Sequence, residues 1–546
     1  MPDYRIAVVD VGKTNKKVFV YDEALTCLNP DERGVVLEPV QWQGTECDDM
    51  AGIRRWMLDA LKAAAERFPG IRCVSISAHG ATIAMLGRGG DEVFPGDGGL
   101  VFPIVSYTQP ITAEEEAAFY RDVDLSPEDV QRRTGTARFA WLLNHGKAVH
   151  WLQHRHPDRW RRVTDVLMFP QYLGYLLTGG KAIEPTYIGC HGCLLDISGE
   201  RYSAVAERLG LIDTLPPLPF RNTWEPLGTL TPAIADETGL PPDCIVTLGV
   251  HDSNAALVPY FVRAFRKTGT GGEGGEAFGM AGTGGDCQVS GKTGTGTADG
   301  ASPRFPRFSA SSPFPRFVVQ DSGTWIVTMA PAETAAFAED EIGREVFFNW
   351  SIYGRPVKTT IFRGGAEFEF YRDHVLPGRD HPAEMDIDLL RGIVEACEAF
   401  ALPTIERGSG LFPGSVARLV GTDTIFRDAT TAWTVIDLGL AIQGTQAITM
   451  AAGDDVESIF IEGNVGRSNP VYRSVIAGLY PQASVSYGTL GGAPYGAAIL
   501  GAAAVEGVRP EALADRVRMT LEPAPPPAID PAALRAYADA FLERLH

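Results

Sequence analysis

Two segments about half a chain apart share one pattern: an apolar strand, an acidic residue, a glycine-bearing turn and a second strand. In residues 6–21 the acid is Asp10 and the turn is Gly12-Lys13-Thr14-Asn15. In residues 317–327 the acid is Asp321 and the turn is Ser322-Gly323-Thr324. This recurrence predicts two duplicated α/β domains that face each other. Because strand–glycine–strand segments are common, coincidence is the alternative at this point.

The chain length agrees with two domains. A chain of 546 residues is too long for a single hydrophobic core. We place the domains at residues 1–255 and 256–546. Residues 268–317 interrupt the second domain with Gly, Thr and Ser, followed by three Pro-Arg-Phe repeats. This composition buries too little apolar area to offset chain entropy, so we expect a mobile, low-complexity insertion.

Charge and hydropathy exclude several classes of partner. The formal net charge of −20 argues against a nucleic-acid-binding protein, which needs clustered Lys and Arg. The N-terminus has no basic region followed by a long apolar stretch, so no signal peptide is expected. We find no uninterrupted apolar run of about 18 residues, the length of a membrane helix. The expected location is therefore the cytoplasm, with no membrane partner.

Eight cysteines are too few for a disulfide scaffold in a chain of this length. Cys190 and Cys193 form a lone CxxC around His191. A zinc site usually needs a second such pair, and a redox CxxC usually begins a helix. We therefore interpret this pair as structural.

Periodicity and capping signals give a coarse secondary structure. Thr112 followed by three Glu, and Thr231-Pro232, are typical helix starts. Cys244 to Val250 is predicted to be a strand that runs into His251-Asp252. Further helices are predicted at 50–67, 387–407, 430–452 and 492–505, further strands at 73–77 and 458–461, and a glycine-containing turn at 463–466.

The two commonest nucleotide-binding devices are missing. A P-loop requires G-x-x-x-x-G-K-[ST], and neither Gly12-Lys13-Thr14 nor Gly291-Lys292-Thr293 has glycine at the first position. Residues 269–274 match G-x-G-x-x-G, but no strand precedes them and no helix follows. A bound nucleotide would have to be held in another way.

The residues at the two turns suit phosphoryl transfer, which needs a metal-binding carboxylate, phosphate donors and a base. Asp10 is placed to face a metal ion. Asp252 is predicted to end a strand just after His251, so its side chain could reach a cleft between domains. Either could instead hydrogen-bond its own turn. The candidate phosphate donors are Lys13, Thr14, Asn15, Lys17, Ser322, Gly323 and Thr324.

Several segments together resemble the FGGY carbohydrate kinases, within the actin-like ATPase group. Residues 10–17, DVGKTNKK, resemble the family's first phosphate motif, and Asp321-Ser322-Gly323-Thr324-Trp325 resembles the second in its rhamnulokinase-like form. The stretch VLMFPQYLGYLLTG at 166–179 and the run from Gly228 to Asp252 resemble two further segments. Residues 463–470 resemble the adenosine motif, and 491–498 the closing Gly/Ala helix.

The resemblance implies an α/β fold of duplicated ribonuclease-H-like domains with an interdomain cleft. It implies ATP-dependent phosphorylation of a sugar hydroxyl with Mg²⁺, Asp252 as general base and Asp10 near the metal. The first domain would bind the sugar and the second ATP. The resemblance implies adenosine contacts at Gly463, Asn464, Gly466 and Asn469, phosphate contacts at Gly12 and the donors above, and sugar contacts at His79, Gly80, Thr82, Tyr107, His251 and Asp252.

The sequence also departs from the family pattern. Lys13 replaces the usual Thr, Thr82 replaces a substrate-binding carboxylate, and the adenosine turn lacks consecutive glycines. A catalytically degenerate nucleotide- and sugar-binding sensor of the same fold is therefore the alternative function. The second motif favours a ketose or deoxyketose resembling rhamnulose, fuculose, xylulose or ribulose. A small-molecule sugar is the expected partner, and a homodimer is left open.

Overall fold

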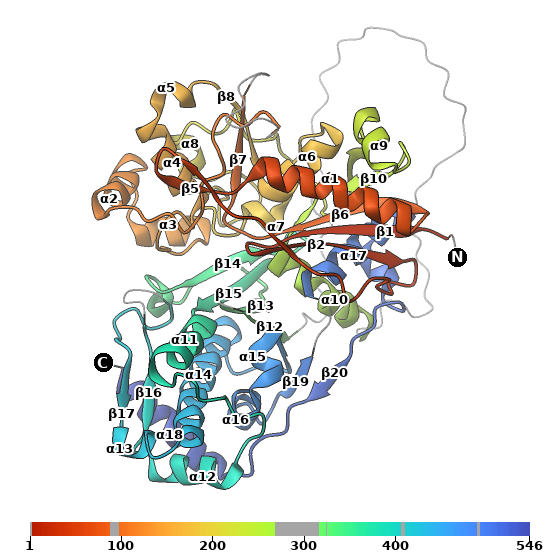
Figure 1. Ribbon diagram of the computed structural model, residues 1–546. Coiled ribbons are helices and arrows are strands. Elements are labelled where there is room, and N and C mark those ends of the chain that lie inside the picture. Colours follow the sequence, from red (N-terminus) through yellow and green to blue (C-terminus); the bar gives the residue numbers. More distant parts are fainter. Residues whose placement is uncertain are drawn as a thin grey trace, which may run out of the picture.

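The computed structural model describes residues 3–87, 98–267, 316–323, 325–405, 410–488 and 492–545. The predicted 268–317 insertion, except for its last two residues, lies outside the described residues, as do the G-x-G-x-x-G stretch and Thr324. Figure 1 shows two α/β domains, one above the other, joined near the centre of the molecule.

The N-terminal domain is built on a seven-stranded sheet with the order β3-β2-β1-β6-β10-β9, in which β11 also pairs with β6. β1 and β2 are antiparallel, whereas β1–β6 and β6–β10 are parallel. The sheet strands are β1 (Arg5–Val11), β2 (Asn15–Asp22), β3 (Val35–Val36), β6 (Ile71–Ala78), β9 (Pro226–Thr229), β10 (Ile245–Thr247) and β11 (Val250–His251).

Two small strand pairs and ten helices surround this sheet. The pairs are β4 (Val40–Trp42) with β5 (Thr45–Cys47), and β7 (Ile83–Gly87) with β8 (Val163–Met168). The helices are α1 (Met50–Arg67), α2 (Ala113–Asp122), α3 (Pro127–Thr134), α4 (His145–Arg155), α5 (Pro157–Trp160), α6 (Phe169–Thr178), α7 (Pro185–Ile188), α8 (Ala204–Arg208), α9 (Pro232–Thr238) and α10 (Asp252–Lys267).

The C-terminal domain repeats the strand pattern in the order β14-β15-β13-β12-β18-β19-β20. β12 and β13 are antiparallel, and β12–β18 and β18–β19 are parallel. Each sheet therefore places an antiparallel hairpin beside two parallel strands, which confirms the predicted duplication. Its strands are β12 (Phe317–Ser322), β13 (Ile326–Pro331), β14 (Val346–Trp350), β15 (Pro356–Phe362), β18 (Ser458–Glu462), β19 (Ser484–Gly488) and β20 (Leu521–Pro523).

A separate pair, β16 (Phe400–Leu402) with β17 (Arg418–Val420), belongs to this domain. Its described residues also form eight α-helices and three short helices, η1 (Glu339–Glu341), η2 (Tyr371–Val375) and η3 (Pro510–Leu513). The α-helices are α11 (Gly364–Phe370), α12 (Ile387–Ala396), α13 (Thr422–Ile425), α14 (Ala429–Ala452), α15 (Gly463–Ser468), α16 (Pro470–Leu479), α17 (Gly492–Glu506) and α18 (Pro531–Glu543).

Local signals set the helix starts as predicted. The Thr112 hydroxyl accepts a hydrogen bond from the Glu115 N–H, and the Glu115 carboxylate accepts one from the Thr112 N–H, a complete capping box. Thr231 caps α9 and Gly239 ends it with φ +71°.

Three local predictions are wrong. The helix predicted at 387–407 ends at Ala396, because β17 pairs with the segment that follows as β16. Asp252 is the first residue of α10, so it follows β11 without ending it. The predicted turn at 463–466 is the first part of helix α15, where a left-handed conformation is needed only at Gly463 (φ +82°).

A third hydrophobic core joins the two halves. It contains Ile6, Val8 and Cys73 from the N-terminal sheet, together with residues of α10 and α17. Gly501 of α17 lies against Ile6 and Ser75, where an added Cβ would be 2.7 Å from the Ile6 side chain. The predicted boundary after residue 255 falls inside α10, and α17 packs on the N-terminal sheet although it is near the end of the chain (Figure 1).

One helix, α14, is long and apolar enough to cross a membrane by length and composition alone. However, 78% of its most apolar 18-residue window is buried inside the protein. Trp433, Leu438 and Ile442 of α14 are part of the C-terminal core. We therefore interpret α14 as a core helix.

Candidate active site

The first turn connects β1 and β2 and displays the residues predicted to contact phosphate. The Gly12 N–H donates to the Asn15 carbonyl at 3.0 Å, which closes the turn. Thr14 and Asn15 are exposed at its tip. Asp10, near the end of β1, is paired in register with Lys17 on β2 and Ser77 on β6. The turn therefore presents exposed donors beside one carboxylate.

The two other lysines of this turn are already bonded within the protein. Lys13 Nζ donates to Asp48 Oδ1 at 2.6 Å and lies 5.2 Å from the centre of the Tyr107 ring. The buried Lys16 donates to the Lys13 carbonyl at 2.9 Å. Lys13, predicted to bind phosphate, is thus held towards the Tyr107 side of the site. Neither Asp48 nor Lys16 was named as a site residue from the sequence.

The second turn connects β12 and β13 and is held against α15. The Gly323 N–H donates to the Trp325 carbonyl at 3.0 Å. The Ser322 hydroxyl donates to the Glu462 carbonyl and accepts from the Gly466 N–H at 3.2 Å. Ser322 therefore fixes the second phosphate turn to the first turn of α15, which bears the predicted adenosine residues.

Asp252 lies where β11 ends and α10 begins, and its two carboxylate oxygens have different surroundings. Oδ1 accepts from the Ser253 N–H at 2.6 Å and lies 3.2 Å from His251 Nε2. Among the described residues the hydrogen bonds of this carboxylate involve Oδ1, and the side chain is 33% exposed. Oδ2 is thus the oxygen that can accept a proton from a ligand.

Asn254 sets the tautomer of His251. The Asn254 Nδ2 group lies 3.4 Å from the Thr186 carbonyl, which accepts a hydrogen bond and so requires the amide nitrogen on that side. The same nitrogen is 3.1 Å from His251 Nδ1 and donates to it. His251 therefore carries its proton on Nε2 and donates it to Asp252.

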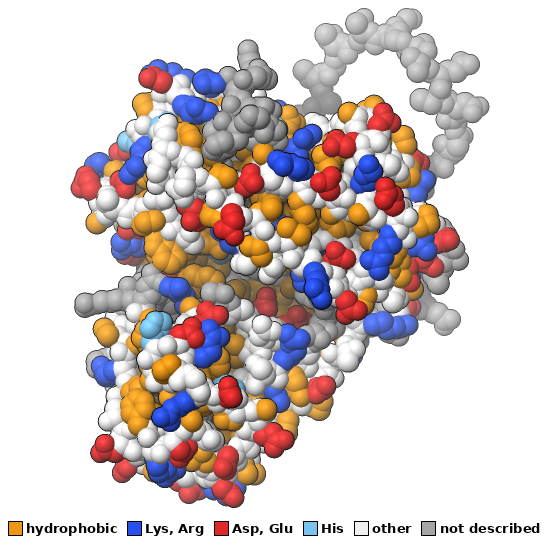
Figure 2. Space-filling view, in the orientation of Figure 1, with side chains coloured by type: hydrophobic (Ala, Val, Ile, Leu, Met, Phe, Trp, Pro, Cys, Tyr) orange, Lys and Arg blue, Asp and Glu red, His pale blue; other side chains and the backbone are white. Residues whose placement is uncertain are grey.

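Three carboxylates from both domains influence one another electrostatically. Burial, and then the nearby Asp252 carboxylate, raise the pKa of Asp10 to about 7. The same two causes raise the pKa of Asp321 to about 6. Burial is also the main cause that raises the pKa of Asp252. Asp252 is therefore close enough to Asp10 of the first hairpin and to Asp321 of the second to raise the pKa of both carboxyls. Figure 2 shows a groove between the two domains.

The donor set fits a magnesium ion. Asp10 and Asp321 offer carboxylate oxygens, the ligands that Mg²⁺ prefers together with water and phosphate. Burial is the main cause of the raised pKa of both groups, and the negative charge of Asp252 raises it further. A bound cation would supply the missing positive charge.

The predicted sugar residues gather beside Asp252 in the N-terminal domain. The His79 ring lies 6.0 Å from the Tyr107 ring and 5.1 Å from the Phe169 ring. Burial, followed by the Asp252 and Asp48 carboxylates, raises the pKa of Tyr107 to about 12. Asp48 Oδ2 is buried and has no hydrogen-bond partner among the described residues, so it remains an available acceptor.

Thr82 has a structural environment that the sequence did not reveal. Its hydroxyl donates to the Gly80 carbonyl at 3.2 Å, and its N–H donates to the Tyr187 hydroxyl at 3.1 Å. Tyr187 in turn donates to the His79 carbonyl at 2.7 Å. Thr82 thereby holds the loop that carries His79 and Gly80.

The CxxC segment contributes to the same region. Cys190 and Cys193 are both free thiols. Cys190 Sγ lies 2.9 Å from His191 Nδ1 and 4.0 Å from His251 Nε2. A Cβ on Gly80 would come within 2.7 Å of His251 Nε2 and 3.0 Å of His191 Nδ1, so only glycine fits there. Cys190 therefore lies next to His251, the residue that precedes Asp252.

The predicted adenosine residues differ in their surroundings. Asn464 is exposed on the first turn of α15, whereas Asn469 is buried and donates to Asp437 Oδ1 at 2.6 Å. The same Asn469 side chain caps α16 by accepting from the Tyr472 N–H at 2.9 Å.

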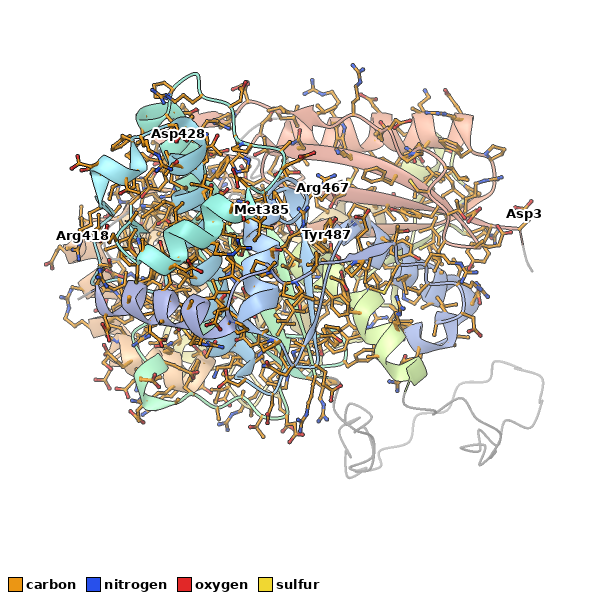
Figure 3. All side chains as sticks on the ribbon, turned by 90° about the horizontal axis from the view of Figure 1, so that it is seen from below. Asp3, Met385, Arg418, Asp428, Arg467 and Tyr487 are labelled. Carbon is orange, nitrogen blue, oxygen red and sulfur yellow. The ribbon has the colours of Figure 1, made fainter. Side chains whose placement is uncertain are left out.

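Arginine and aromatic side chains that the sequence reasoning missed lie close to α15. The guanidinium of Arg473 lies 4.2 Å from the centre of the Tyr487 ring and donates to the Gly466 carbonyl at 3.1 Å. Figure 3 shows Arg467 on α15 and Tyr487 on the adjacent β19, near the middle of the view from below. Arg467, Arg473 and Tyr487 form what we call the corner at α15, which combines positive charge with an aromatic face.

Comparisons with known proteins agree with this architecture. The chain is 32% identical over 120 residues to the probable L-xylulose kinase of Pasteurella multocida, a match that covers 21% of this chain and 24% of that protein. The curated relatives are thus matched over less than a quarter of their own length.

Solved structures match over nearly the whole chain. A carbohydrate kinase from Novosphingobium aromaticivorans superposes with a TM-score of 0.74 at 26% identity and covers 99% of this chain and 100% of that one. Plasmodium falciparum glycerol kinase with ADP has the same fold, with a TM-score of 0.74 at 12% identity over 100% and 98% of the two chains.

Family models cover both halves of the chain. The model "FGGY family of carbohydrate kinases, N-terminal domain" matches residues 5–259. The model "Carbohydrate kinase FGGY, C-terminal domain" matches residues 314–510. The two hairpins, the groove between them and these matches agree, and the chain belongs to the FGGY family of carbohydrate kinases.

Proposed function

We propose that this protein transfers the γ-phosphoryl group of ATP to a hydroxyl of a small sugar. The observation that supports this most strongly is that the Asp252 carboxylate raises the pKa of Asp10 on the first hairpin and of Asp321 on the second. Phosphoryl transfer needs a cation-binding carboxylate and a base next to phosphate-binding turns, and these are the parts that meet here.

Asp252 acts as the general base in this proposal. Oδ1 is engaged by the Ser253 N–H and by His251, so Oδ2 takes the proton of the attacking hydroxyl. The sugar oxygen forms a bond to the γ-phosphorus while the bond from that phosphorus to the β,γ-bridging oxygen breaks, and ADP leaves. His251 and Asn254 orient the carboxylate and do not themselves exchange a proton with the substrate.

The groups predicted to hold ATP lie on both sides of the groove. The exposed turn residues Thr14 and Asn15 and the N–H groups near Gly323 would bind the phosphates, and the corner at α15 would bind the adenosine. Asp10, with Asp321, would hold Mg²⁺. When bound, that ion shields the phosphate charge and orients the γ-phosphoryl group.

The sugar would occupy the space near His79, Tyr107 and His251. We propose a ketose, which the partial match to an L-xylulose kinase supports. Lys13 and Asp48 would bind hydroxyls remote from the reacting one, since Asp48 Oδ2 is an acceptor without a partner. The proposed location is the cytoplasm.

The first test is Asp252→Asn, assayed by ADP release over a panel of ketoses and polyols with Mg-ATP. Asn keeps the shape of Asp252 but cannot accept the proton, so turnover should fall by ~10² or more while ATP still binds. A matched control is Asp243→Asn, because Asp243 is exposed and pairs with Arg72 at the surface.

The alternative sensor function predicts a different pattern. A sensor would show a rise in melting temperature with sugar and Mg-ATP, because both ligands bind the folded state. It would release no ADP in the wild-type protein with any sugar of the panel. A near-wild-type rate in Asp252→Asn would instead reject the proposed base.

A further inference from the structure

Two histidines and one aspartate form a cluster at the outer end of the N-terminal domain. His150 and His154 are four residues apart on α4, so their side chains lie on one face of the helix. Asp122 is the last residue of α2, which packs against α4. Figure 1 shows these two helices far from α10, where Asp252 begins the helix.

The three side chains converge on one point. His150 Nε2 lies 2.9 Å and His154 Nε2 lies 3.0 Å from the same oxygen, Asp122 Oδ2. The two imidazole rings are 4.1 Å apart between centres, and the three ligand atoms all lie within 4.8 Å of one another. Tetrahedral coordination with bonds of about 2.0–2.1 Å separates ligand atoms by about 3.3 Å. The two histidine-to-aspartate distances are within a few tenths of an ångström of this value.

The surroundings leave room for an ion to enter. His154 and Asp122 have side chains that are 57% and 38% exposed, whereas His150 is 6% exposed and fixes one ligand in place. A cavity of about 130 Å³ between α2 and α4 is lined by both histidines. Lys147 and Arg155 also line this cavity, and they pair with Glu116 and Glu115. Arg121 Nε is 3.8 Å from Asp122 Oδ1, the oxygen away from the histidines.

We propose that His150, His154 and Asp122 bind a divalent transition metal ion, with zinc as the best match. Two imidazoles and one carboxylate suit Zn²⁺, Ni²⁺ or Cu²⁺ and do not suit Ca²⁺ or Mg²⁺, which prefer oxygen ligands. Three protein ligands leave a fourth position to water. The bound ion links the end of α2 to α4 and stabilises the folded domain without taking part in phosphoryl transfer.

The test is a Co²⁺ titration of the full-length protein, followed by its visible absorption, together with Zn²⁺-dependent melting temperatures. His154→Gln removes one exposed ligand, and His374→Gln is the matched control because His374 is exposed in the other domain. We expect the wild type and His374→Gln to bind Co²⁺ with a tetrahedral spectrum and to melt higher with Zn²⁺. In His154→Gln the affinity should fall at least about tenfold, since even losses outside the ligand shell cost that much.

A second cluster must be distinguished from this one. Cys190, His191 and His251 also offer three ligand atoms within 4.8 Å, but metal binding there would add a thiolate-to-metal absorption band. Unchanged binding in His154→Gln overturns the proposal, as does a signal that always carries the thiolate band and disappears in Cys190→Ser. Sugar-dependent ADP release by His154→Gln with Mg-ATP is the control for folding. A rate equal to that of the wild type would show that the loss of metal binding is not caused by misfolding.

Discussion

Asp10 shows how the fold creates a charge that its ligand must neutralise. The residue lies on a buried strand of the N-terminal sheet, and its pKa is raised to about 7 by burial and by the Asp252 carboxylate. An exposed Asp has a pKa near 4. Because the folded state holds the proton more tightly, Asp10 contributes stability that is present below about pH 4 and lost as the pH rises through about 7.

This gives a pH prediction for magnesium binding. Between pH 6 and 8 the ionised fraction of a group with a pKa of about 7 rises about tenfold, so Mg²⁺ affinity should rise by a similar factor. The measurement is the rise in melting temperature with Mg²⁺ at each pH, for the wild type and Asp10→Asn. The variant should bind more weakly and show a smaller pH effect. Equal Mg²⁺ affinity at pH 6 and 8 in the wild type would contradict the role of Asp10.

At the scale of elements, the second phosphate turn depends on its joint with α15. Gly463 begins α15 with φ +82°, and a Cβ there would lie 2.4 Å from the Ser322 carbonyl oxygen. The backbone of β12 and the start of α15 can approach this closely only because this position has no side chain.

Gly463→Ala should therefore weaken ATP binding and lower stability by about 1–3 kcal/mol through backbone strain and overpacking. Gly453→Ala is the control, since Gly453 also has a positive φ, +71°, but nothing lies within 4 Å of its added Cβ. Both substitutions place alanine at a positive φ, which costs conformational free energy. Only Gly463→Ala also brings a Cβ against Ser322. Equal ATP affinities in the two variants, measured by calorimetry, would show that this joint does not position the nucleotide.

The sequence predicted these elements where a local signal set them. Thr112 and Thr231 mark helix starts by capping, and the β1–β2 and β12–β13 turns are marked by an acid and a glycine. The end of α12 at Ala396 could not be predicted, because the following segment becomes a strand only through pairing with β17, about sixteen residues later.

The same limit applies to the candidate site. Asp10 and Asp252 were found because they stand next to strands in recognisable motifs. Asp48, Arg473 and the Cys190–His191 pair carry no local signal and reach the site through tertiary packing. The contacts between Asn254, His251 and Asp252 could not be predicted from the sequence either, because the Thr186 carbonyl that orients Asn254 belongs to a distant segment.

In the whole molecule, α10 and α17 pack between the two domains and join them. α10 begins with Asp252, and α17 packs on α10 and on the N-terminal sheet. Gly496 of α17 faces α10 so closely that an added Cβ would lie 1.8 Å from the Ala255 carbonyl oxygen. The proposed base and the packing between the domains thus share the first turn of one helix.

Gly496→Ala should therefore affect stability and catalysis together. Overpacking at this contact should cost about 1–3 kcal/mol of unfolding free energy, because the neighbouring atom is backbone and cannot rotate away. The resulting displacement of α10 would move Asp252, and a misplacement of about 1 Å can lower turnover about 10²-fold. Gly392→Ala is the control, because Gly392 lies within α12 with nothing within 4 Å of its added Cβ. The measurements are urea unfolding and ADP release on both variants. If Gly496→Ala is destabilised but its turnover is unchanged, interdomain packing does not set the position of Asp252.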